Sequence, residues 1–98
     1  KEICCKTLPE RIEKLIEIGD AYIILPGGTG TFLELAMVWE SFNKNILKIK
    51  PVSCLGEMWK KIVDVMEERI KKENRKTNLI GCYDTIEECV EYIEKYFS

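Results

Sequence analysis

The 98-residue sequence contains no histidine and no glutamine. Without histidine the chain has no His-based catalytic triad, and it lacks the commonest side-chain ligand of transition metals. Five cysteines are present, an odd number without C-x-x-C spacing, which favours neither a zinc site nor a disulfide framework. We therefore expect no metal. Cys54 and Cys89 stand in apolar surroundings, and we predict that both are small core residues.

Long apolar runs and an excess of one charge are also missing. No apolar segment approaches the roughly 20 residues that span a bilayer, and no signal-peptide pattern opens the chain. The 15 basic and 17 acidic residues are interspersed, so no electrostatic footprint for nucleic acid or an anionic membrane is present. We expect a cytoplasmic protein that binds neither. The abundance of Lys, Glu and Ile without Gln is typical of proteins from thermophiles.

Helical and strand patterns alternate along the chain. Helices are predicted at residues 8–18, 31–42 and 57–73 and after a cap at Asp84 or Thr85, and strands at 21–25, 51–55 and 79–83. This order favours an α/β fold with a parallel sheet flanked by helices, as one domain over residues 1–98. Because the pattern opens on a helix and three strands make a thin sheet, we expect the second half of a larger doubly wound domain.

The helix predicted at 31–42 is apolar around most of its circumference. One side is lined by Phe32, Leu35, Trp39 and Phe42, and much of the rest is covered by Leu33, Ala36 and Met37. A helix with this pattern is buried on more than one side. In so short a chain a partner subunit is the natural cover, and we predict a homodimer or a higher homo-oligomer.

The stretch "LPGGTGTFLEL", residues 25–35, lies between the first predicted strand and this helix. Its glycines allow a sharp turn with positive φ and a close approach of the backbone to a ligand. The free N–H groups and the positive dipole end of the helix then face whatever lies over the loop. Loops of this kind bind phosphate in open α/β sheets. The candidate phosphate ligands are Gly27, Gly28, Thr29, Gly30 and Thr31.

Two common glycine motifs are excluded, because no Gly-Lys-Ser/Thr follows and Gly28-Thr29-Gly30 does not continue as G-x-x-G. A plainer alternative is a capping box in which Thr31 caps the helix and Glu34 reaches back. Such a cap contributes about 1 kcal/mol. It accounts for Thr31 and Glu34 but not for three preceding glycines, and Glu34 can serve both purposes.

Arg11 is the second candidate residue for chemistry. Its neighbours three and four positions away are Thr7, Leu8, Lys14 and Leu15, none of which is acidic. Its helix leads directly into the strand that ends at the glycine loop. Arg11 is therefore either an ordinary surface arginine or a residue of the site.

The combination of Arg11, "GDAYIILPGGTGTFLEL" and "KPVSCLGEMWKKI" resembles the Lonely Guy family, whose members were long misannotated as lysine decarboxylases. Residues 26–34 match the family motif PGGxGTxxE in full. The resemblance runs from about Pro9 to Leu55 and more loosely onward. It implies a Rossmann-like parallel sheet flanked by helices. Family proteins are longer, with a first half that these 98 residues do not include.

The resemblance also implies an activity. Characterised members hydrolyse the N-glycosidic bond of nucleoside 5′-monophosphates, such as AMP, to free base and ribose 5-phosphate, without a metal or organic cofactor. By position, Glu34 and Arg11 would be catalytic, while the loop glycines and Thr31 would hold the phosphate. A decarboxylase is disfavoured because the motif contains no lysine. Two alternatives stay open: a nucleotide or phosphorylated-cofactor carrier resembling molybdenum-cofactor carriers, and an inactive fragment that only assembles.

Overall fold

The computed structural model describes residues 19–98, in which strands and helices alternate. The elements are β1 (Tyr22–Ile24), α2 (Thr29–Asn43), β2 (Val52–Leu55), α3 (Glu57–Lys72), β3 (Ile80–Tyr83) and α4 (Ile86–Tyr96). The helix predicted at residues 8–18, and Arg11 with it, lies outside the described residues. Within the described part of the chain, no helix is both long and apolar enough to cross a membrane.

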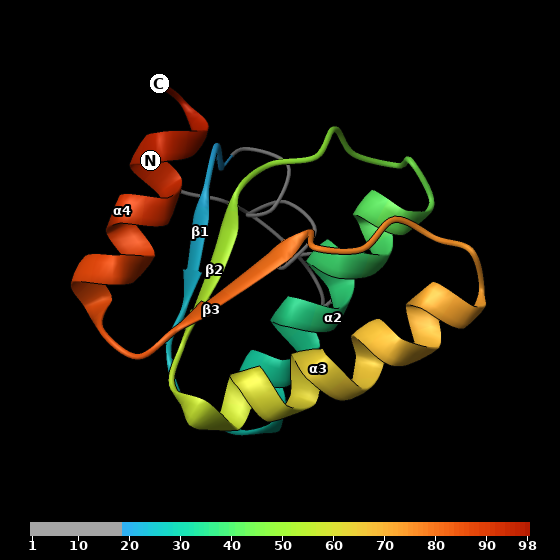
Figure 1. The fold of residues 1–98 in the computed structure, drawn as a ribbon, viewed down its shortest axis with the longest axis horizontal. Coiled ribbons are helices and arrows are strands. Elements are labelled where there is room, and N and C mark those ends of the chain that lie inside the picture. Colours follow the sequence, from blue (N-terminus) through green and yellow to red (C-terminus); the bar gives the residue numbers. More distant parts are fainter. Residues whose placement is uncertain (1–18) are drawn as a thin grey trace, which may run out of the picture.

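The three strands form one parallel sheet in the order β1-β2-β3. Ile24 is in register with Cys54, and Cys54 with Cys82. Parallel neighbours require a crossover, and α2 and α3 supply the two that this sheet needs. Figure 1 shows α2 and α3 on one face of the sheet and α4 on the other. The predicted α/β class, a Rossmann-like parallel sheet flanked by helices, is confirmed.

The main core lies between the sheet and the pair α2 and α3. Its members are Ile24, Leu35, Val38, Trp39, Phe42, Val52, Cys54, Trp59, Val63, Ile70 and Ile80. Trp59 is fully enclosed, and four of these residues come from α2. The buried side chains of α2, from Leu35 to Phe42, thus anchor the second half of that helix in the core, and its beginning stays exposed.

The second face of the sheet packs against α4. There the Ser53 hydroxyl donates to the carbonyl oxygen of Cys89 at 3.2 Å. Cys54 and Cys89 are both fully buried, which confirms their prediction as core residues. The contact with the Cys82 thiol, together with burial, raises the pKa of Cys54, so this thiol stays protonated and unreactive.

The start of α4 lies at one of the two residues predicted to cap it. Thr85, one of the two predicted caps, is the N-cap, and its hydroxyl accepts from the amide of Glu88 at 3.2 Å. The Glu88 carboxylate in turn accepts from the amide of Thr85 at 3.2 Å. This reciprocal capping box satisfies two amides that the helix itself leaves without partners.

The surface of α2 is less completely covered than its composition suggests. Leu35, Val38 and Trp39 are buried, but the side chains of Phe32 and Leu33 are 45% and 36% exposed. Burial of α2 on more than one side is therefore not achieved by residues 19–98 alone, and apolar surface is left at its outer side.

Candidate functional site

The glycine loop leads directly into α2. Gly28 is the N-cap, in an extended conformation with φ −99° and ψ −151°. The first intrahelical bond runs from the amide of Phe32 to the carbonyl oxygen of Gly28, at 3.0 Å. The amides of Thr29, Gly30 and Thr31 precede this bond and point out of the helix end. The positive end of the helix dipole lies at the same place.

The predicted capping box of Thr31 and Glu34 does not form, which corrects that alternative. The helix begins at Thr29, two residues earlier than predicted, and no side chain caps it. Thr31 is therefore the third helical residue, past the position from which a hydroxyl can cap. The same four-residue pattern does form a box at Thr85, where the helix begins one residue later. Thr31 and Glu34 consequently have no capping role.

The glycines of the loop matter because they lack a side chain, and not because they adopt a left-handed backbone conformation. Positive φ was predicted for Gly27, Gly28 and Gly30, but among the described glycines only Gly56 has it, at 110°. A Cβ on Gly27 would collide with the Thr31 side chain, so this glycine lets Thr31 pack against the loop. A Cβ on Gly28 or Gly30 would meet no atom within 4 Å. Both leave bare backbone that a ligand can approach closely.

Trp59 of α3 is hydrogen-bonded to the backbone at the start of the loop. Its indole N–H donates to the carbonyl oxygen of Leu25, the last residue before the glycine motif, at 3.0 Å. Beside it, Gly56 faces Pro26, and the amide of Gly56 donates to the carbonyl oxygen of Tyr83 at 2.9 Å. The carboxyl ends of the three strands are thus tied together. Sequence reasoning gave Trp59 no role in the site, although a buried indole N–H generally requires an acceptor.

Glu34 lies one helical turn beyond the open amides. It follows Gly30 by four residues and Thr31 by three, which places all three on the same side of α2. Helical side chains lean toward the N-terminus, so the exposed Glu34 is directed over the turn that contains the bare Gly30. Among residues 19–98 no basic side chain forms an ion pair with Glu34.

The structure therefore brings Gly27, Gly28, Thr29, Gly30, Thr31 and Glu34 together, and the predicted partner Arg11 lies outside the described residues. The arrangement is an open helix N-terminus after a parallel strand, with a carboxylate one turn further on. Such an end attracts anions and suits phosphate in particular, whereas the carboxylate repels a second anion. These features place the chain among the α/β proteins that have an open glycine loop between a parallel strand and a helix, the arrangement that other α/β sheets use to bind phosphate.

Comparison with known families agrees with this class. A family model described as "possible lysine decarboxylase" matches residues 1–95. The chain therefore belongs to this family, the Lonely Guy family that the glycine motif indicates. No curated protein and no solved structure matches the chain.

Proposed function

We propose that this protein hydrolyses the N-glycosidic bond of a nucleoside 5′-monophosphate, such as AMP, releasing the free base and ribose 5-phosphate. The observation that carries the proposal is the uncapped start of α2. Three amides and two hydroxyls are available there for a phosphate, and a carboxylate with no capping role lies one turn away. Membership of the Lonely Guy family supports a nucleotide as the ligand.

The phosphate would bind over Gly28 and Gly30, where the bare backbone allows oxygen atoms to reach the amides. The hydroxyls of Thr29 and Thr31 would add donors. The α-carbons of Thr29 and Glu34 are about 7.5 Å apart along the helix axis, since each residue rises about 1.5 Å. This separation suits a ribose that has its phosphate at the helix end and its anomeric carbon beside Glu34.

Glu34 would supply the chemistry at the anomeric carbon. Cleavage of an N-glycoside builds positive charge on the ribosyl ring, and a fixed carboxylate stabilises that charge while it activates the attacking water. Arg11 would be the second catalytic residue, its cation anchoring the phosphate or helping the base to leave. Its family role is the basis for including it, because Arg11 lies outside the described residues.

The description "possible lysine decarboxylase" suggests a different reaction, and the residues near the loop disfavour it. No lysine occurs between residues 15 and 43, the segment that contains the loop and all of α2. A lysine that forms a Schiff base with a carbonyl compound would have to come from elsewhere. Glu34 and the phosphate cradle instead match hydrolysis of a nucleotide.

A panel of nucleoside 5′-monophosphates, with chromatographic detection of free base, tests the proposal. The matched variant is Gly30→Leu, because position 30 is helical, has open space around it and tolerates a good helix former. We expect the wild type to release one base, and Gly30→Leu to keep its thermal stability but bind that nucleotide at least about tenfold more weakly.

Undiminished nucleotide binding by Gly30→Leu would show that the phosphate lies elsewhere. If the wild type binds a nucleotide but releases no base, the function is that of a nucleotide carrier and not of a hydrolase. If it neither binds nor cleaves any member of the panel, these residues serve assembly alone.

We also propose that two copies of the chain associate through α2 and α3. Exposed apolar side chains gather there: Phe32 is 45% exposed, Val65 66% and Met66 42%. A cavity of about 260 Å³ lies between the two helices, lined by Phe32, Leu35, Ala36, Trp39, Glu40, Asn43, Met66, Ile70 and Arg75. An apolar side chain of a second copy would fill it, and the apolar centre with a charged rim has the anatomy of an interface.

A charge placed on this surface should separate the subunits. Val65→Glu is expected to raise the dissociation constant of the dimer at least about 100-fold, because a carboxylate would lose its hydration at the centre of the interface. Sedimentation velocity measures this. Val90→Glu is the control, since Val90 is 41% exposed on α4, across the sheet. A wild-type chain that sediments as a monomer at micromolar concentration would contradict the proposal.

A further inference from the structure

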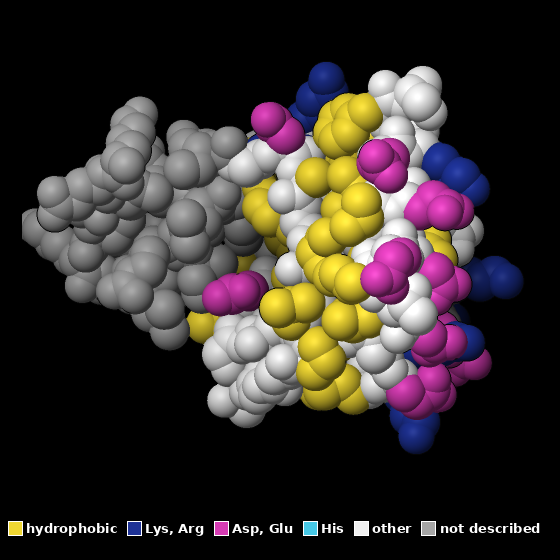
Figure 2. All heavy atoms as spheres, turned by 90° about the vertical axis from the view of Figure 1, so that its left-hand side faces the viewer, with side chains coloured by type: hydrophobic (Ala, Val, Ile, Leu, Met, Phe, Trp, Pro, Cys, Tyr) yellow, Lys and Arg dark blue, Asp and Glu magenta, His cyan; other side chains and the backbone are white. Residues whose placement is uncertain are grey.

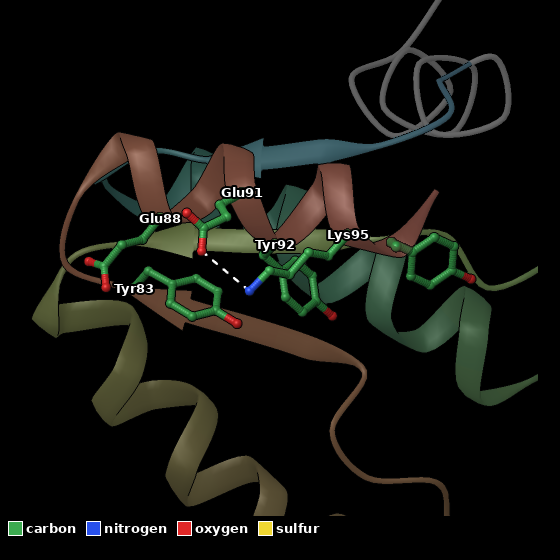
Figure 3. A pocket seen from close by; sticks show the side chains of 6 residues that line it. Tyr83, Glu88, Glu91, Tyr92 and Lys95 are labelled. Atoms are coloured by element: carbon green, nitrogen blue, oxygen red, sulfur yellow. Dashed lines mark ion pairs between the residues drawn. The ribbon is translucent and has the colours of Figure 1, made fainter. Parts of the chain in front are cut away.

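A second pocket lies on the other face of the sheet, between α4 and the end of β3. Its volume is about 350 Å³, within the usual range of small-molecule sites. The lining residues are Tyr83, Glu88, Glu91, Tyr92, Lys95 and Tyr96. Five of them follow one another at helical spacing on α4, and Tyr83 ends β3 (Figure 3). None of these residues takes part in the nucleotide site.

Two tyrosine rings form the wall of the pocket. The centroids of Tyr83 and Tyr92 are 5.5 Å apart, with ring planes tilted by 44°. Both rings lie over Gly81, where a Cβ would approach Tyr83 to 2.9 Å and Tyr92 to 3.2 Å. A glycine inside a strand weakens the sheet, and here it provides the space that the two rings occupy. Burial raises the pKa of both phenols, so the rings stay neutral.

The charges around the pocket are predominantly negative. Residues 84–98 contain five acidic side chains and one basic side chain, Lys95. Figure 2 shows acidic side chains along the border of the hydrophobic band that covers the α4 face. Glu88 holds the amide and the hydroxyl of Thr85 through a single oxygen, Oε1, at 3.2 and 3.1 Å. This field repels anions such as a nucleotide phosphate and attracts cations.

The Lys95 ammonium itself marks the place for a cation. It forms an ion pair with Glu91 at 3.4 Å, and Figure 3 shows it reaching back toward Glu91 beside the tyrosine rings. Burial raises the pKa of the Tyr83 phenol, and the Lys95 charge acts on that pKa in the opposite direction. The two side chains of this pair are 75% and 67% exposed, so the pair contributes little stability and a competing cation displaces Lys95 easily.

We propose that this tyrosine pocket binds a small organic cation, an alkylated ammonium compound with an apolar body. The rings of Tyr83 and Tyr92 offer their negative faces to the cation, and Glu91 neutralises its charge after Lys95 has moved aside. Aromatic walls combined with a carboxylate are the recognition chemistry of quaternary ammonium groups. The proposal is independent of the nucleotide site, since the two sites share no residue.

Choline tests the proposal, with its neutral isostere 3,3-dimethylbutan-1-ol beside it. NMR titration of the full chain should show choline shifting the ring signals of Tyr83 and Tyr92. We expect choline to bind at least about tenfold more tightly than the isostere, because only choline has the charge that attracts it to the rings. Equal affinity of the two compounds, or no shift at these rings, would overturn the proposal.

Three exposed positions on α4 give variants that leave the fold intact. Glu91→Gln is expected to weaken choline binding about fivefold, because it removes the carboxylate. Lys95→Gln should strengthen it about threefold, because it removes the competing ammonium. Glu94→Gln makes the same charge change on α4 at a residue that does not line the pocket, and it should have little effect. Weaker choline binding in Lys95→Gln, with acetate or inorganic phosphate shifting the tyrosine signals instead, would identify an anion site and refute the proposal.

Discussion

Replacing Glu34 with glutamine should lower the rate of base release by about 10²- to 10⁴-fold, the usual contribution of a general base or acid. Glutamine keeps the size of the side chain and its place beside the bare turn at Gly30, but it neither stabilises a ribosyl cation nor takes a proton from water. The proposed phosphate contacts lie one turn earlier, so nucleotide affinity should stay the same or rise slightly as a negative charge is removed. Chromatography of released base and calorimetric titration with the nucleotide measure the two effects separately.

Glu40→Gln is the matched control for this variant. Glu40 lies on the same helix but forms ion pairs with Lys44 at 3.4 Å and Arg75 at 3.3 Å, away from the loop. We expect it to retain full turnover. A Glu34→Gln protein that releases base within about twofold of the wild-type rate would exclude Glu34 from the chemistry. Loss of binding together with turnover would assign Glu34 to the binding of substrate.

The fold was predictable because local signals and tertiary structure agree. The strands predicted at 21–25, 51–55 and 79–83 each contain an observed strand, shorter by one or two residues. Short apolar runs bounded by turn residues predict buried parallel strands, and the intervening stretches are long enough only for helical crossovers. The cap at Thr85 was also predictable, since a capping box depends only on residues three positions apart.

The same local rule failed at the glycine loop. Thr31 and Glu34 match a capping box, yet α2 begins two residues earlier, at Thr29. Thr29 and Gly30 are themselves helical, so Thr31 lies inside the helix and not at its cap. Glycine accepts many backbone conformations, so the sequence does not say which one it adopts. The positive φ assigned to three glycines was wrong for this reason. The structure does show an uncapped helix start after the glycine loop, but its position along the chain required the structure, and its use as a phosphate site stays a prediction.

Contacts between distant segments were beyond the reach of sequence patterns. The spacing of apolar residues identifies Trp59 as a core residue, but it does not identify the carbonyl that the indole N–H reaches 34 residues earlier. The tyrosine pocket depends in the same way on β3 and α4 packing over Gly81. Periodicity reports which side of an element is buried and not which atoms meet there.

Trp59→Ala should have the largest effect on stability of any change to the site. Trp59 is completely buried, and truncation of a large aromatic core residue costs about 3–5 kcal/mol in free energy of unfolding. A domain of this size has only about 5–15 kcal/mol in total. The milder Trp59→Phe keeps most of the ring but removes the bond to Leu25, at a cost of about 1–2 kcal/mol. Because that bond fixes the start of the glycine loop, Trp59→Phe should also weaken nucleotide binding.

Trp39→Phe separates the hydrogen bond from the loss of indole volume. Trp39 is also buried, but within residues 19–98 its indole N–H has no hydrogen-bond partner. Removing a buried donor without a partner relieves a desolvation penalty, whereas removing the Trp59 donor breaks a bond. Denaturant unfolding followed by circular dichroism should therefore show a larger loss for Trp59→Phe, and calorimetric titration should show weaker nucleotide binding in that variant alone. Equal losses in the two variants would mean that the bond to Leu25 contributes nothing to the loop, and packing alone would then support the proposed phosphate site.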